Sequence, residues 1–327
     1  MRPIDGTHDP KLRTWVPGAQ DHPEFPIQNL PVGRFRPRGT DFPPLPGMAI
    51  GDQIVNLTEA ADAGLLPGAA AEALDMWDAE GMAAFLELGV ETWGLLRQGV
   101  SEMLREGTEE GDEAKAMADD LLTPMSEAEL VLPTVIGDYT DFYASIHHAT
   151  NVGSMFRPDD PLLPNYKYVP IGYHGRASSI VPSGTAIHRP MGQTRPNAEK
   201  PPQFGLSASL DYELEIGAVV GMGNPLGRSI PIEHAEDHLF GLVLLNDWSA
   251  RDIQSWEYQP LGPFLGKSFA TTISPWVVTL EALEPFRVAA FERAESDPEP
   301  QPYLRTQSGG FDVTLDVTLS SQKMRAT

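Results

Sequence analysis

The sequence predicts a mixed α+β fold that is mainly β, and three patterns along the chain support this class. Residues 23–56 consist of short apolar pieces separated by proline and glycine, which is typical of a small β module. Apolar residues then recur at helical spacing between Gly81 and Arg105. From Val131 onward, apolar and alternating runs broken by proline-rich loops indicate a strand-rich region.

Length and composition favour two domains. A chain of 327 residues with 41% hydrophobic residues can bury a sizeable core. We expect a first domain at residues 1–130, which holds the β module and a helical segment, and a second at residues 131–327. The acidic stretch 106–120 is expected to form a solvated loop or helix end. The helical stripe expected to be buried consists of Met82, Phe85, Leu86, Trp93, Leu96, Val100, Met103 and Leu104.

Composition also excludes several kinds of site and partner. The chain has no cysteine, so it has no disulfide framework, no thiolate nucleophile and no cysteine-ligated metal. No apolar run of transmembrane length is present, and the first residues lack the apolar core of a signal peptide, so we expect a soluble cytoplasmic protein. The net charge of −23 would repel nucleic acid and anionic membranes, and neither is expected as a partner.

An alternating strand is expected to place two acids on one side of a sheet. In residues 211–221, Glu213 and Glu215 occupy alternate positions, so both must point the same way. The apolar residues expected on the opposite face are Tyr212, Leu214 and Ile216. The same alternation in residues 311–319 predicts a half-buried strand.

A third acid, Asp247, ends the apolar strand predicted at residues 240–247, so three carboxylates can converge on one site. At about 4 Å and an effective dielectric near 20, each like-charged pair costs roughly 4 kcal/mol. Such a cluster needs either protonation or a cation. The hard cations Ca²⁺ and Mg²⁺ are the natural partners of carboxylate oxygens, and we therefore expect one of them here.

Two segments that contain histidine are candidates for chemistry. Asp141 and His148 lie two turns apart if their segment is helical, and they would then share a face. The residues alone leave His148 open as a structural histidine or a base, and its neighbour His147 leaves the same choice. In residues 172–176, His174 lies between glycines that allow close approach of the backbone to a ligand, although the segment could equally be a turn.

Cationic and polar side chains follow the third acid. Arg251, Gln254 and Tyr258 recur at helical spacing, so they form either a row of donors or the polar face of an amphipathic helix. Lys267 lies in a Gly-Pro loop that is otherwise apolar, and a lysine in such surroundings requires an anion. The acidic cluster or an oxyanion of a substrate would provide it.

Several of these segments together carry a family resemblance. They are residues 135–143, 148–153, 155–157, 172–179, 189–193, 213–215, 246–254 and 260–269. In these segments the chain closely resembles the fumarylacetoacetase family, and residues 25–31 and 49–54 extend the resemblance into the amino-terminal part.

The resemblance implies a fold and an activity. It implies a small SH3-like N-terminal domain followed by a larger β-roll catalytic domain of the fumarylacetoacetase type, and a homodimer. The implied reaction is hydrolysis of a carbon–carbon bond in a small diketo-diacid, 4-fumarylacetoacetate, to fumarate and acetoacetate. This is the last step of tyrosine and phenylalanine catabolism. A divalent ion would stabilise the enolate and a histidine would activate water.

The resemblance also implies roles for individual residues. The Ca²⁺ ligands would be Asp141, Glu213, Glu215 and Asp247, and the residues at a nearby Mg²⁺ position would be Lys267 and Thr271. The general base would be His148, and charge stabilisation would come from Arg251 and Lys267. The substrate contacts would be Tyr143, Arg157, Tyr173, Gln254 and Tyr258.

Family members continue past the position of Thr327 with a Glu that orients the base and a Thr that contacts substrate. We therefore expect this chain to have greatly reduced or no activity and to aggregate, and we expect strand 311–319 to lack its neighbours. His147 replaces the family's usual Gln and is interpreted as a tolerated neighbour. Three alternatives remain: a related acylpyruvate hydrolase or decarboxylase of the same fold, a metal-dependent diacid-binding module without catalysis, and a purely structural scaffold.

Overall fold

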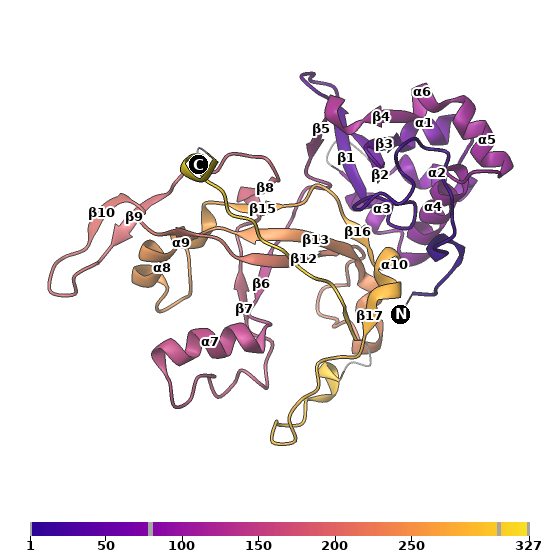
Figure 1. Cartoon of the computed structure of the whole chain (residues 1–327). Coiled ribbons are helices and arrows are strands. Elements are labelled where there is room, and N and C mark those ends of the chain that lie inside the picture. The colour runs from indigo at the N-terminus through magenta and orange to yellow at the C-terminus, as the bar shows by residue number, and fades with distance from the viewer. Residues whose placement is uncertain (1, 78–80, 306–308, 326–327) are drawn as a thin grey trace.

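The amino-terminal region is built on an antiparallel sheet of five strands in the order β4-β3-β2-β1-β5 (Figure 1). The computed structural model describes residues 2–77, 81–305 and 309–325. The strands are β1 (Val32–Pro37), β2 (Leu45–Ile50), β3 (Gln53–Asn56), β4 (Leu122–Pro124) and β5 (Ala128–Val131). The predicted β module therefore forms three strands of this sheet. The two outer strands come from residues 122–131, which follow the helical segment.

Helices lie between β3 and β4, and the first and last of them contact this sheet directly (Figure 1). They are α1 (Leu57–Asp62), α2 (Gly68–Leu74), α3 (Ala83–Leu86), α4 (Val90–Met103), α5 (Glu109–Ala116) and α6 (Ala118–Leu121). Every residue of the predicted stripe is buried, so that prediction is confirmed. The stripe is interrupted at Gly89, whose φ of 82° separates α3 from α4. The acidic stretch 106–120 is mainly helical, in α5 and α6. No helix of the described chain is long and apolar enough to cross a bilayer.

A second sheet carries the central strands in the order β12-β13-β15-β8. The strands are β8 (Ile180–Pro182), β12 (Leu214–Val220), β13 (Leu239–Asp247) and β15 (Thr271–Ile273), and β16 (Val278–Thr279) also pairs with β13. The pairings β12–β13 and β13–β15 are antiparallel, whereas β15–β8 is parallel. The strands predicted around residues 211–221 and 240–247 are thus confirmed.

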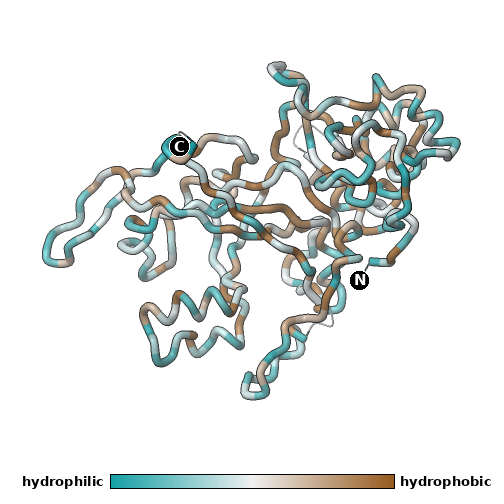
Figure 2. The backbone as a smooth tube through the Cα atoms, in the orientation of Figure 1, coloured by the Kyte–Doolittle hydropathy of each residue, from teal (hydrophilic) through white to brown (hydrophobic). Residues whose placement is uncertain are grey.

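The two faces of the second sheet differ in burial. Val243 and Leu245 on β13 belong to the main hydrophobic core, which also contains the stripe of α3 and α4. The ring of Phe240 meets the ring of Trp93 edge-on at 5.2 Å, so the strand is anchored to the helical region. Leu214 and Ile216 lie on the exposed face. Figure 2 shows the hydrophobic segments gathered along these central strands and in the amino-terminal region.

Short elements surround the second sheet. The paired strands are β6 (Thr140–Phe142) with β7 (Gly172–His174), β9 (Met191–Thr194) with β10 (Gln203–Leu206), β11 (Leu210–Asp211) with β14 (Ser249–Ala250), and β17 (Arg287–Val288) with β18 (Gly310–Phe311). The helices are α7 (Ile146–Phe156), α8 (Arg251–Glu257), α9 (Leu265–Ser268), α10 (Leu280–Leu283) and α11 (Gln322–Arg325). The 3-10 turns are η1 (Gly6–His8), η2 (Met125–Glu127), η3 (Ala177–Ser179), η4 (Ile232–His238), η5 (Glu284–Phe286) and η6 (Pro302–Leu304). Figure 1 shows α7 and the β9–β10 hairpin projecting from the sheet.

The prediction of a strand at residues 311–319 is wrong. Only Gly310 and Phe311 form a strand, and residues 312–319 are exposed without regular structure. In the described part of the chain, no strand pairs with residues 312–319. Alternation creates an apolar face, but backbone hydrogen bonds to a neighbour make a strand, and that neighbour is absent from this sheet arrangement.

A buried arginine joins α4 to the segments that precede β1. Arg97 is 2% exposed, and burial lowers its pKa to about 10. Its guanidinium donates to the carbonyl oxygens of Asn29 at 2.7 Å and Gln28 at 2.5 Å, and to the hydroxyl of Thr7 at 3.2 Å. A buried charge is tolerated only with such partners, so Arg97 links three separate segments of the amino-terminal region.

We expect Arg97→Met to lower the free energy of unfolding by about 3 kcal/mol, because buried carbonyls lose their donors. Urea unfolding followed by circular dichroism measures the change. Arg13→Met is the matched control, since its side chain is 68% exposed and pairs with the exposed Glu106, and we expect it to cost less than about 1 kcal/mol. Equal losses in the two variants would contradict a structural role of Arg97.

Candidate active site

Three carboxylates from three different strands converge at the edge of the second sheet. Glu215 lies on β12, Asp247 is the last residue of β13, and Asp141 lies in the middle of β6. One oxygen from each lies within 4.8 Å of the others. The predicted convergence of acids is therefore present. Antiparallel pairing of β12 with β13 brings the first two together, and the β6–β7 ribbon adds the third.

The electrostatics of this group are unfavourable without a cation. Burial, followed by the charges of Asp141 and Asp247, raises the pKa of Glu215 to about 8. Asp247 is 2% exposed, and burial raises its pKa to about 6 although Lys267 opposes the shift. All donors in the group are carboxylate oxygens, which are the preferred ligands of hard divalent cations. The residues present thus fit a divalent metal ion, which would remove the repulsion.

Lys267 is buried beside the group and contacts two acids. Its ammonium nitrogen lies 2.5 Å from Oε2 of Glu213 and 2.6 Å from Oδ2 of Asp247. The prediction that this lysine requires an anion is therefore confirmed, although Lys267 lies on the short helix α9 and not in a loop. Thr271, which the resemblance groups with Lys267, is buried and faces Asp247 across the β13–β15 ladder.

Glu213 lies next to the converging group and is held by two cations. Besides Lys267, the guanidinium of Arg251 lies 2.7 Å from Oε1 of Glu213 and 2.9 Å from Oδ2 of Asp211. Burial raises the pKa of Glu213, but Lys267 and Arg251 outweigh it, so its pKa is lowered. Of the four predicted metal ligands, three are thus brought together, and Glu213 is salt-bridged at their side.

Two tyrosines cover the acids from the β6–β7 ribbon. Tyr173 lies directly opposite Asp141 across the ribbon, and its hydroxyl bonds to that carboxylate. Tyr139, which the sequence analysis did not single out, precedes Asp141 by two positions. A Cβ at Gly175 would lie 2.0 Å from the ring of Tyr139. The glycine beside His174 therefore leaves room for this ring. The spacing of two residues between Tyr139 and Asp141 is the sequence signal that could have identified Tyr139.

His148 lies in the first turn of α7. Its backbone N–H donates to the hydroxyl of Ser145, which caps the helix, and its exposed ring meets the ring of Tyr143 edge-on at 5.5 Å. The prediction that Asp141 and His148 share a helical face is wrong, because Asp141 lies on strand β6 and the helix begins only at Ile146. The ring of His147 contacts Phe291.

The remaining predicted substrate contacts lie at the ends of two helices. Arg157 follows α7 and donates to the carbonyl of Pro161 at 2.9 Å. Gln254 on α8 accepts from Arg251 at 3.0 Å, and Tyr258 is exposed at the end of the same helix. The predicted helical row of Arg251, Gln254 and Tyr258 is thus confirmed.

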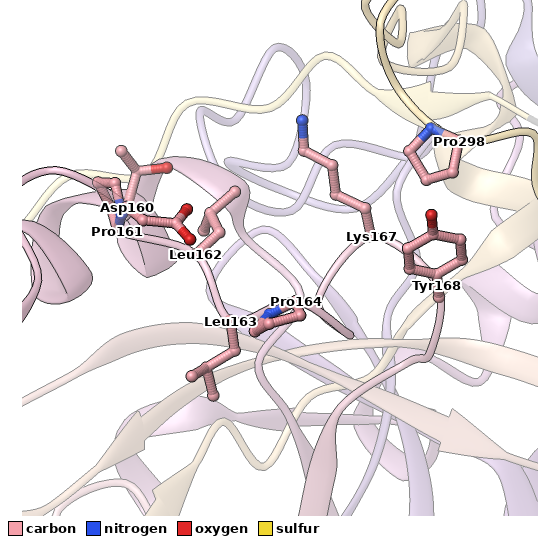
Figure 3. Close-up of a pocket in the computed structure, with 9 residues that line it drawn as sticks. Asp160, Pro161, Leu162, Leu163, Pro164, Lys167, Tyr168 and Pro298 are labelled. Atoms are coloured by element: carbon pink, nitrogen blue, oxygen red, sulfur yellow. The ribbon is translucent and has the colours of Figure 1, made fainter.

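A hollow lies beside α7 and the loop that follows it (Figure 3). Figure 3 shows Leu163 and Pro164 below it, and Lys167 and Tyr168 on the side of Pro298. The residues that line it are Thr150, Asp160, Pro161, Leu162, Leu163, Pro164, Lys167, Tyr168 and Pro298. Lys167 forms an ion pair with Asp297, so the hollow joins the loop after α7 to the segment near residue 298. None of the predicted site residues lines it.

Comparisons with known proteins agree on one family. The family model of the fumarylacetoacetate hydrolase C-terminal region matches residues 138–326, and that of the fumarylacetoacetase N-terminal region matches residues 28–133. The fumarylacetoacetase of Oryza sativa subsp. japonica is 46% identical over 326 residues, which cover 98% of this chain and 74% of the relative. Those of Bos taurus and Homo sapiens are 48% and 46% identical, each over 95% of this chain and 73% of the relative.

The raised pKa of Glu215 generates a prediction for the metal-free chain. In the folded state this pKa is about 8, against an ordinary value of 4.5. Because the folded state holds this proton more tightly than the unfolded state, the associated stability is present at low pH and is lost as pH rises through about 8. Between pH 4.5 and about pH 8, the melting temperature in the presence of a chelator should therefore fall more steeply for the native sequence than for Glu215→Gln.

Addition of Ca²⁺ should reduce this fall in the native sequence, because a cation stabilises the ionised carboxylates. Thermal unfolding at a series of pH values, with chelator and with Ca²⁺, measures both effects. Identical pH profiles for the native chain and Glu215→Gln would show that this carboxyl is not the group that carries the dependence.

Proposed function

This chain belongs to the fumarylacetoacetase family, and we propose that the acids at the edge of its second sheet form its active site. The chain is a hydrolase that cleaves the carbon–carbon bond of 4-fumarylacetoacetate to give fumarate and acetoacetate. The observation that supports the location of the site is the convergence of Asp141, Glu215 and Asp247 within 4.8 Å of one another. The buried Lys267 contacts this group.

The proposed metal ligands are Asp141, Glu215 and Asp247, with Glu213 beside them and Lys267 and Thr271 at a second position. The oxygen-only donor set favours Ca²⁺, with Mg²⁺ near Lys267 and Thr271. A bound divalent ion would act as a Lewis acid that stabilises the enolate formed when the carbon–carbon bond breaks. Lys267 and Arg251 keep Glu213 ionised and oriented, which is supported by its lowered pKa.

His148 is the proposed general base. A neutral imidazole is suited to take a proton from water near neutral pH and later to return it to the leaving carbon. Its ring is exposed, so it is accessible to water and substrate, and its edge contact with Tyr143 restricts its orientation. The oxyanion that forms when water adds to the carbonyl would be stabilised by the nearby cations Arg251 and Lys267, each such donor being worth about 3 kcal/mol.

The substrate is a diacid, and its carboxylates require donors at some distance from the reacting carbons. Arg157 and Tyr258 are exposed at the ends of α7 and α8, where they are free to meet such a ligand. Charge-assisted hydrogen bonds to a carboxylate are the stronger class, which favours Arg157 for this role. The complete set of proposed substrate contacts is Tyr143, Arg157, Tyr173, Gln254 and Tyr258.

The wider setting follows from the family. We propose an SH3-like domain at residues 1–130, supported by the antiparallel sheet β1–β5, and a β-roll catalytic domain at residues 131–327. A cytoplasmic homodimer is proposed as well. The exposed apolar face that includes Leu214, Ile216 and Leu244 supports association with a second copy, because such faces are costly to leave in water.

The proposed base is tested by His148→Gln, which keeps a polar side chain but removes the titrating nitrogen. We expect turnover of fumarylacetoacetate to fall by about 10²–10⁴-fold, with Ca²⁺ binding unchanged. His147→Gln is the matched control: it changes the adjacent residue in the same helical turn and restores the usual family residue. It should leave turnover within about twofold. A comparable loss in both variants would contradict the assignment of His148.

A binding experiment separates catalysis from mere binding. Calorimetry with Ca²⁺ and fumarate measures whether the site holds a cation and a diacid. Binding of both by the 327-residue chain without any turnover would replace the hydrolase by a metal-dependent binding module. Turnover of fumarylacetoacetate together with binding of both would support the hydrolase.

A further inference from the structure

The backbone and the ring of Tyr139 are both held by neighbouring residues. It precedes Asp141 by two residues and lies one residue before β6 begins, where continued extended spacing directs the two side chains to the same face. Its carbonyl accepts a hydrogen bond from the N–H of Gly175 at 2.8 Å, which extends the β6–β7 pairing by one residue. The ring lies over Gly175, where a Cβ would come within 2.0 Å of it, and also packs against the hydrophobic core. The ring is thus held from both sides.

The hydroxyl of Tyr139 is buried and has no hydrogen-bond partner among the described residues. The neighbouring tyrosines differ in this respect, since Tyr173 bonds to Asp141 and Tyr166 donates to the carbonyl of Tyr143 at 3.0 Å. Burial of a hydroxyl without a partner is unfavourable and calls for an explanation. An oxygen acceptor that enters the site when a metal ion or substrate binds would explain why this hydroxyl is buried without a partner.

The surroundings of this hydroxyl are rich in acceptors. Burial raises the pKa of Tyr139, and the charges of Asp247, Asp141, Glu215 and Glu213 raise it further. A tyrosine phenol is ordinarily protonated near neutral pH, so this hydroxyl carries one O–H donor. An oxygen acceptor close to the carboxylate group would satisfy that donor.

We propose that Tyr139 is a positioning residue of this active site, whose hydroxyl donates a hydrogen bond to an oxygen ligand held at the Asp141–Glu215–Asp247 group. The ligand oxygen belongs either to a water on the bound cation or to the acetoacetate moiety of substrate and product. This inference rests on the proposed metal-dependent function. Gly175 is also required for this placement, because only glycine leaves room for the ring of Tyr139.

The test is Tyr139→Phe, which keeps the ring and removes only the oxygen. Calorimetry measures binding of Ca²⁺ alone and of acetoacetate to the Ca²⁺-loaded chain. We expect one of the two affinities to fall about 3–10-fold. Weaker binding of Ca²⁺ alone identifies a bound water as the acceptor, whereas weaker binding of acetoacetate with Ca²⁺ affinity unchanged identifies the ligand oxygen.

The metal-free melting temperature distinguishes positioning from support of the fold. Because the hydroxyl has no hydrogen-bond partner within the described part of the chain, Tyr139→Phe should not lower that temperature. Tyr166→Phe is the matched control: it makes the same chemical change at a hydroxyl that bonds to a backbone carbonyl, and both ligand affinities should stay unchanged. Unchanged affinities in Tyr139→Phe, with Ca²⁺ bound normally by the native chain, would overturn this inference. Failure of the native chain to bind Ca²⁺ would instead overturn the proposed function.

Discussion

The crowding of carboxylates at the end of β13 is the constraint on which the rest of the site depends. Burial, and after it the repulsion between like charges, raises the pKa values of Glu215 and Asp247. Lys267 relieves part of it, but its two contacts are with Glu213 and Asp247. Asp141 and Glu215 lie on the side where a divalent cation is still required.

This strain is sustainable because β13 is held in the core. Phe240, Val243 and Leu245 bury one face of the strand against the helical region, so the backbone that carries Asp247 has little freedom to move away. Pairing with β12 then fixes Glu215, and pairing with β15 places Thr271 opposite Asp247. A site that must keep acids together is therefore built on strands and not on loops.

The groups proposed for proton transfer and substrate binding have a different setting. His148 and Arg157 lie at the two ends of α7, a helix that projects from the sheet with few buried residues (Figure 1). The ring of His148 contacts the ring of Tyr143, and Arg157 donates to the carbonyl of Pro161. The molecule thus combines an acid cluster anchored in the core with reactive groups on an accessible surface.

The sequence by itself determined what local periodicity controls. Alternation placed Glu213 and Glu215 on one face, helical spacing aligned Arg251 with Gln254, and the apolar surroundings of Lys267 required an anion. Each of these follows from backbone geometry or burial within a short segment, and each is confirmed. The helical stripe of α3 and α4 belongs to the same class.

Only the tertiary structure decided which distant groups meet. The strand β6 brings Asp141 close to the acids of β12 and β13, and no local sequence pattern predicts this proximity. The same holds for the two cations on Glu213, the ring of Tyr139 over Gly175, and residues 312–319, whose alternation met no partner strand in the described chain. Contacts between distant residues depend on the packing of whole elements, and the periodicity of one segment does not specify which elements lie next to it.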